Sequence, residues 1–171
     1  MNKDPELFRA HGGATPLFSL NGVKTWARVV DVYDGDTLTC VLPVFDRMYR
    51  FQVRMMGIDT CEIRSKNPAN KERAIRARDR LIQLVTGGAA NQRGMSKKEI
   101  DALFEREVHL VWLHCLEFDK YGRLLGAVYA SDHAGAEPFS DVLVRERLAY
   151  SYTGDTKLTE EQQLAILTGT V

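Results

Sequence analysis

The sequence predicts an α+β fold, mainly β, in which five strands form a small barrel with flanking helices. Runs rich in β-branched and aromatic residues recur three times in the first third of the chain, a helical pattern follows, and two more such runs come later. Turn residues separate the runs, and the chain has no internal repeat. Three hairpin-connected strands followed by a helix and a hairpin suit a small, partly open barrel.

The first three strands are expected at residues 27–33, 37–42 and 49–58. Asp34 and Gly35 separate the first two strands. They favour a tight hairpin turn, because glycine accepts a positive φ at which other residues are strained. Three consecutive strands with short connections predict a meander.

A long helix is expected at residues 68–86. Asn67 can cap its free N–H groups, and proline suits its first position. Apolar residues then recur at helical spacing until Gly87 and Gly88 end the pattern. A second, short helix follows a capping-box sequence, and we interpret residues 87–107, which contain it, as an insertion. The insertion either contacts a substrate or partner or lengthens a surface loop, and we favour the loop.

Strand character returns at residues 108–116 and 124–130, on either side of the turn at residues 119–122. Ser140 can cap a third helix, and residues 159–162 form a capping box for a short terminal helix. The order β-β-β-α-β-β-α therefore predicts an OB-fold barrel.

Length and composition predict one domain. The chain has 171 residues and 44% apolar content, which suit a single core at residues 23–171. Residues 1–22 precede it as an arm that is poorly ordered or leads into the first strand. The 23 basic and 23 acidic residues cancel, so the chain lacks the overall positive field of many non-specific nucleic-acid binders. Any phosphate binding must come from a local patch.

Cysteine content and the N-terminal sequence limit the cellular setting. The three cysteines cannot all pair and have no metal-ligand spacing, which disfavours a disulfide framework or a zinc site and favours buried thiols. We find no export signal and no apolar run near the ~20 residues that span a membrane. We therefore expect an intracellular monomer with no membrane partner, although a chain whose signal had been removed would look the same.

Acidic residues stand at two strand ends that a meander brings together. Asp36 begins the second strand and Asp59 ends the third, so both should lie at the same end of the sheet. Single aspartates in turns mean little, because most of them are solvated or cap a backbone N–H. Two facing carboxylates, with the Thr60 carbonyl and waters, suit a hard cation such as Ca²⁺, with Mg²⁺ or Mn²⁺ as alternatives.

Phosphodiester hydrolysis needs an activated water, positive charge beside the pentacoordinate phosphate, and help for the leaving oxygen. A carboxylate base, a metal and two arginines supply all three. Arg54 and Arg123 are the candidates, because a guanidinium holds two phosphate oxygens and stays protonated. Each could instead be an ordinary surface arginine, since the chain has many others.

Four segments, VDVYDGDT, RMMGIDTCE, DKYGR and LVRERLAYSY, resemble the staphylococcal nuclease (thermonuclease-like) family over residues 27–152. The resemblance implies an OB-fold nuclease that hydrolyses DNA or RNA, with single strands favoured, in a calcium-dependent reaction. It implies that Asp36 and Asp59 bind Ca²⁺ through their side chains and Thr60 through its carbonyl.

The same resemblance implies roles around the substrate. Glu62 would orient or deprotonate the attacking water, and Arg54 and Arg123 would clamp the phosphate. Four further residues would line the nucleotide pocket, where they contact phosphate or stack on a base: Lys120, Tyr121, Tyr150 and Tyr152. A buried core position is the alternative for one of the last two tyrosines, and a solvated hairpin position is the alternative for the lysine.

Cys61 departs from the family pattern, which usually has proline in this turn. Because proline fixes φ, its loss could loosen the backbone that presents Thr60 and Glu62. The main competing interpretation is a non-catalytic OB-fold module that binds single-stranded nucleic acid or serves as a scaffold. The intact set of acids and arginines favours the enzyme, since a pure binder gains nothing from carboxylates that repel phosphate.

Overall fold

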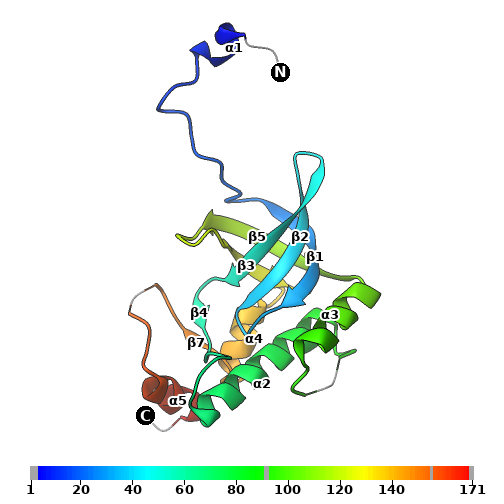
Figure 1. The fold of residues 1–171 in the computed structure, drawn as a ribbon, viewed down its shortest axis with the longest axis vertical. Helices are drawn as coiled ribbons and strands as arrows, with labels where there is room; N and C mark the ends of the chain where they lie inside the picture. The colour runs from blue at the N-terminus through cyan, green and yellow to red at the C-terminus, as the bar shows by residue number, and fades with distance from the viewer. Residues whose placement is uncertain (1–3, 91–92, 155, 170–171) are drawn as a thin grey trace.

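The computed structural model describes residues 4–90, 93–154 and 156–169, and within them five strands form a closed barrel in the order β1-β2-β3-β6-β5 (Figure 1). The barrel strands are β1 (Lys24–Val32), β2 (Thr37–Val44), β3 (Arg47–Met55), β5 (His109–Phe118) and β6 (Leu124–Tyr129). All neighbours are antiparallel except β3 and β6, whose parallel pairing closes the barrel. The predicted OB-type barrel is confirmed, and it is closed rather than partly open.

The third predicted strand is in fact two. Gly57 has φ +83°, a backbone conformation that residues other than glycine rarely adopt. It separates β3 from the short strand β4 (Ile58–Asp59). Outside the barrel, β4 pairs with β7 (Tyr150–Ser151), so that Asp59 faces Tyr150 in the register. This two-stranded sheet joins the end of β3 to the C-terminal part of the chain.

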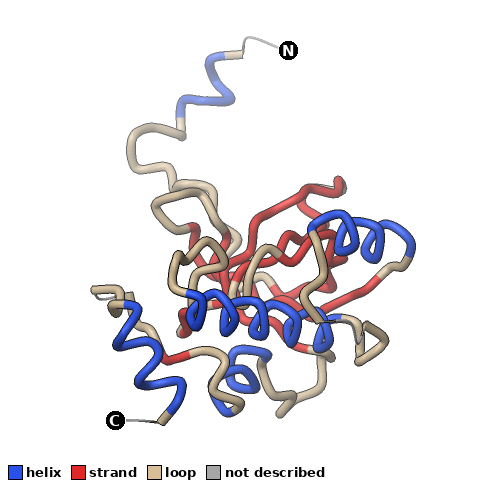
Figure 2. Tube along the Cα trace, turned by 60° about the horizontal axis from the view of Figure 1, so that its bottom comes forward, coloured by secondary structure: helices blue, strands red, loops and turns tan. Residues whose placement is uncertain are grey.

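The helices that follow β4 gather at one end of the barrel (Figure 1). The long helix α2 (Pro68–Val85) begins where predicted, with the Asn67 side chain accepting a hydrogen bond from the Ala69 N–H. It runs across the strands (Figure 2) and contacts β1 and β5. The helix α3 (Lys97–Arg106) has the predicted capping box and packs on β1. The helix lies within the predicted insertion at residues 87–107, of which residues 91–92 lie outside the described residues. Whether the insertion contacts a substrate or partner stays untested.

Two short helices complete the C-terminal part. The capping box predicted for the terminal helix is present at the start of α5 (Glu160–Thr168). The expectation that Ser140 caps the preceding helix is wrong. That helix, α4, spans Phe139–Arg145 and its cap is Pro138, with no side-chain cap hydrogen bond. Burial of Phe139 in the core fixes the helix start there, which places Ser140 inside the first turn.

The core fills the barrel and the space beneath α2 and α3. Fully buried residues come from all of these elements, and the largest include Leu38, Leu81, Phe104, Leu113 and Leu124. Each such side chain contributes about 1.5–3 kcal/mol through burial. The three cysteines are free and buried, as predicted.

Residues 4–19 form an exposed arm that points away from the barrel (Figure 1). The sequence analysis missed its short helix α1 (Pro5–Arg9), although Asp4 caps it and proline opens it. Phe18 packs against Phe45 and Phe118, and Leu20 is buried. No helix among the described residues is long and apolar enough to cross a membrane.

Candidate functional site

Thirteen residues line a cleft of about 460 Å³ where the β1–β2 turn, the end of β3, strand β4 and the β5–β6 turn meet. Every site residue that the sequence analysis named lies in its wall except Tyr150. The wall consists of Tyr33, Asp34, Asp36, Arg54, Asp59, Thr60, Cys61, Glu62, Lys120, Tyr121, Arg123, Tyr152 and Lys157. The meander argument for a common end is therefore correct in its geometry.

The β1–β2 turn presents Asp36 to the cleft. Asp34 Oδ1 accepts the Asp36 N–H at 3.2 Å, which holds the turn. Gly35 does not adopt the positive φ expected from the sequence. It is needed for space instead, because a Cβ there would lie 2.5 Å from the Cβ of Ala77 on α2. The turn is thus held by close packing against the long helix.

Arg54 joins the two central carboxylates. Its side chain lies on β3, in register with Thr37. One terminal nitrogen lies 2.9 Å from Asp36 Oδ2, and the other lies 3.0 Å from Asp59 Oδ1. Both carboxylates are buried, and 13% of the arginine side chain is exposed. The guanidinium therefore links the two buried carboxyl groups.

Two acids of the cleft, Asp34 and Asp36, resist ionisation. Burial raises the pKa of Asp36 to about 8, the neighbouring Asp34 adds to this rise, and Arg54 opposes it. Burial also raises the pKa of Asp34. A cation bound beside these carboxyl groups would offset the cost of ionising them in a buried setting.

Tyr150 lies beneath the cleft and supports its floor. The residue is 3% exposed, and its phenol donates a hydrogen bond to Asp59 Oδ2. Burial, the hydrogen bond to Asp59 and the charge of that residue raise the pKa of Tyr150. The phenol therefore stays protonated and keeps donating to the carboxylate.

The donor set for a cation is small. Asp36 and Asp59 supply the carboxylates, and buried Thr60 lies beside them, with its hydroxyl 3.4 Å from Asp36 Oδ2. Among the residues that the structure describes, no group of three or more His, Cys, Asp or Glu side chains is placed to hold a metal. Two carboxylates and a carbonyl fit an oxygen-binding cation only if waters complete its shell, as they commonly do for Ca²⁺ and Mg²⁺.

Glu62 and Lys157 form the open edge of the cleft. Lys157 Nζ contacts Glu62 Oε1 and lies 3.4 Å from Asp59 Oδ2. The Glu62 side chain is 55% exposed. Sequence reasoning missed Lys157, because it lies in the segment between β7 and α5, which carries no motif.

The β5–β6 turn carries the second arginine. Asp119 Oδ2 accepts the Nε–H of Arg123 at 2.7 Å, and Asp119 Oδ1 accepts the backbone N–H groups of Tyr121 and Arg123, each at 2.9 Å. Burial alone would raise the pKa of Asp119, but hydrogen bonds from Arg123 and Tyr121 lower it. Asp119 thus fixes the turn and aims Arg123, a role that the sequence analysis did not assign.

The β5–β6 turn also carries an exposed aromatic side chain with two basic side chains beside it. Tyr121 is 73% exposed, with Lys120 Nζ 5.1 Å and Arg123 Cζ 5.6 Å from its ring centre. Tyr152, which is half-buried, also lines the cleft wall. An exposed phenol flanked by two cations suits phosphate and base contacts.

Cys61 lines the cleft and also belongs to a second, smaller hydrophobic cluster with Ala74, Tyr150 and Leu167. Its sulfur accepts a hydrogen bond from Asn70 Nδ2 at 3.7 Å. Burial raises its pKa to about 11, so the thiol is protonated near neutral pH. The turn that presents Thr60 is therefore anchored by packing at the position where the family has proline.

Comparison with known proteins agrees with this geometry. The family model described as "Staphylococcal nuclease homologue" matches residues 52–168. None of the curated proteins matches the chain. The matched range begins in β3 and ends at the last residue of α5, and so it includes most of the cleft.

Proposed function

Since this chain belongs to the staphylococcal nuclease family, a family of nucleases and nucleic-acid-binding OB-folds, we propose that it is a calcium-dependent nuclease that hydrolyses phosphodiester bonds of DNA or RNA. One observation carries the proposal. Two buried carboxylates, one exposed carboxylate and two arginines from separate parts of the chain converge on a single cleft. Each of these groups has a use in phosphodiester hydrolysis.

The residues that would hold Ca²⁺ are Asp36 and Asp59, through their carboxylates, and Thr60, through its carbonyl. The geometry supports this assignment, because Arg54 lies 2.9 Å from Asp36 Oδ2 and 3.0 Å from Asp59 Oδ1, and the Thr60 hydroxyl lies 3.4 Å from Asp36 Oδ2, which places the three residues around one point. When bound, the cation supplies positive charge that polarises the phosphate and favours ionisation of a nearby water. Mg²⁺ and Mn²⁺ are the alternatives.

Glu62 is the proposed general base. Its exposed carboxylate is accessible to a water molecule at the edge of the cleft and can accept the proton that the water loses on attack. Arg54 and Arg123 stabilise the charge that develops on the pentacoordinate phosphate and on the leaving oxygen. The Nε–H of Arg123 already binds Asp119, so the terminal nitrogens of its guanidinium are the ones that reach the phosphate.

Nucleotide contacts are assigned to the outer residues of the cleft. Lys120 contacts phosphate, and Tyr121 and Tyr152 contact phosphate or stack on a base. Tyr150, which was expected in the pocket wall, is proposed to act from below by hydrogen bonding to Asp59. A single strand is the proposed substrate, because its unpaired bases are free to stack on tyrosine rings.

The test is cleavage of single-stranded DNA and of RNA in Ca²⁺, in Mg²⁺ and in EDTA. Glu62→Gln should lower kcat by about 10²–10⁴ while the strand still binds, because only the base is lost. Arg123→Ala should lower kcat by about 10²–10³, because it removes a cation from the transition state. Glu161→Gln, an exposed carboxylate on α5, is the matched control and should leave kcat unchanged.

Binding measured on the same variants separates the two classes of function. Fluorescence anisotropy with a labelled strand reports affinity without cleavage. Wild-type protein that binds the strand but does not cut it under any metal condition would refute the nuclease and favour a binding module. Cleavage that persists in EDTA would refute the metal requirement.

A further inference from the structure

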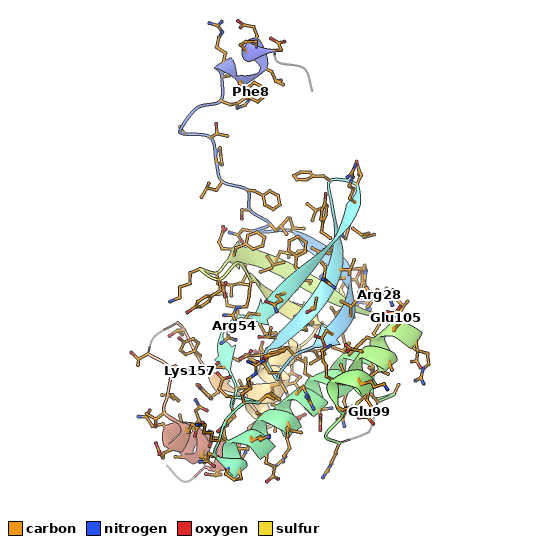
Figure 3. The ribbon with its side chains drawn as sticks, viewed as in Figure 1. Phe8, Arg28, Arg54, Glu99, Glu105 and Lys157 are labelled. Carbon is orange, nitrogen blue, oxygen red and sulfur yellow. The ribbon has the colours of Figure 1, made fainter. Side chains whose placement is uncertain are left out.

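Lys157 places a positive charge where the proposed dication has to act. It lies on the segment between β7 and α5, on the same side of the molecule as Arg54 (Figure 3). Its ammonium contacts Glu62 and lies 3.4 Å from Asp59 Oδ2. One lysine therefore bridges the proposed base and a proposed metal ligand.

The lysine differs from the arginine that contacts the same carboxylate. Arg54 bridges Asp36 and Asp59, and 13% of its side chain is exposed. The Lys157 side chain is 45% exposed and extends from a connecting segment rather than from the barrel. Withdrawing Lys157 into water therefore costs less than withdrawing Arg54, because an exposed ammonium regains hydration and its ion pairs are screened.

The carboxylate that Lys157 approaches is already well supplied with donors. Asp59 Oδ1 accepts from Arg54, and Oδ2 accepts from the Tyr150 phenol. Asp59 keeps these two partners when the ammonium leaves, so the buried carboxylate still accepts hydrogen bonds from two donors. The contact of Lys157 is thus the one that can be exchanged for a metal ion.

We propose that Lys157 is the cation that occupies the metal-free cleft, and that it competes with the dication for Asp59 and thereby sets the metal affinity of the site. This inference rests on the proposed function, because it takes Asp59 as a metal ligand. Lys157 acts as a positioning residue: in the free protein it holds the Glu62 carboxylate at the cleft edge, and metal loading displaces it. The side chain is long enough to turn outward without movement of the barrel.

Calorimetric titration of Ca²⁺ into the full-length, metal-free protein tests this without nucleic acid and without any activity readout. Lys157→Met should bind Ca²⁺ about tenfold more tightly than the wild type, because the competing charge is gone. Lys157→Arg keeps the charge and should stay within about threefold of the wild type. Lys120→Met is the matched control. It removes from the same cleft a cation that lies over the Tyr121 ring, and it should change the affinity less than twofold.

The outcomes distinguish this inference from the proposed function. Tighter binding in Lys157→Met, with little change in the other two variants, supports competition. Equal or weaker binding in Lys157→Met, with normal Ca²⁺ binding by the wild type, overturns the inference and leaves the metal site intact. An equal gain in Lys120→Met would show a general effect of charge and also overturn it. Absence of Ca²⁺ binding in every variant would overturn both proposals.

Discussion

Replacing Asp36 with asparagine should stabilise the metal-free protein, and the gain should grow with pH. The folded chain raises the pKa of Asp36 to about 8, mainly through burial, whereas the unfolded chain has the ordinary value of 3.8. Between these values the folded protein retains a proton that the unfolded chain releases. The contribution of Asp36 to stability is therefore complete below about pH 4 and declines as the pH rises to about 8.

The size of the effect follows from the pKa shift. One pKa unit corresponds to about 1.4 kcal/mol, so a shift over this whole range sets an upper limit of about 6 kcal/mol. Water in the cleft screens part of the burial cost, and we expect roughly half of the limit, about 3 kcal/mol, at pH 8. At pH 4 the wild-type carboxyl is largely neutral in the folded state, and the two proteins should differ by less than about 1 kcal/mol.

Urea unfolding at pH 4, 6 and 8 in EDTA measures this difference. Asp132→Asn is the control, because Asp132 is exposed and its replacement should alter the free energy of unfolding by less than about 0.5 kcal/mol at each pH. Added Ca²⁺ should stabilise the wild type and have little effect on Asp36→Asn. A gain that does not change with pH, or a variant less stable than the wild type at pH 8, would refute the reasoning.

Two further substitutions probe how the cleft is held. Gly35→Ala should lower the free energy of unfolding by about 1–3 kcal/mol, because the added methyl overlaps α2, whereas Gly12→Ala, in open space, should change it little; urea unfolding measures both. Tyr150→Phe should cost about 1–2 kcal/mol at every pH between 6 and 9, since the lost hydrogen bond to Asp59 comes from a phenol that stays neutral throughout. Exposed Tyr49→Phe is its control, and an equal loss there would contradict the assigned role.

Periodicity and caps predicted the elements of the fold because those signals are local. The Asn67 cap and the capping boxes at Ser96 and Thr159 need only neighbouring residues, and all three are present. Most features that were missed or misjudged depend on tertiary contacts, and the exception is α1, whose Asp4 cap and proline are local signals. Ser140 has the chemistry of a cap, but burial of Phe139 decides where that helix starts.

The candidate site shows the same difference between features set by local sequence and features set by tertiary contacts. Residues at strand ends could be placed from the meander alone, and Asp36 and Asp59 do share one guanidinium. The reason for glycine at position 35 could not be read from the sequence, since it depends on the approach of α2. Lys157 could not be found either, because it reaches the cleft only through the docking of the C-terminal segment.

The C-terminal segment is therefore part of the site rather than an appendage of the barrel. Strand β4 carries Asp59, and its partner in the two-stranded sheet is β7, whose Tyr150 donates to that carboxylate. Further along, Asn70 on α2 donates to Gln163 on α5, which ties the segment to the long helix. Loosening this docking would move the floor and the edge of the cleft together while the barrel stayed intact. Metal affinity and the stability of the C-terminal segment should consequently rise and fall together, because both depend on the position of Asp59.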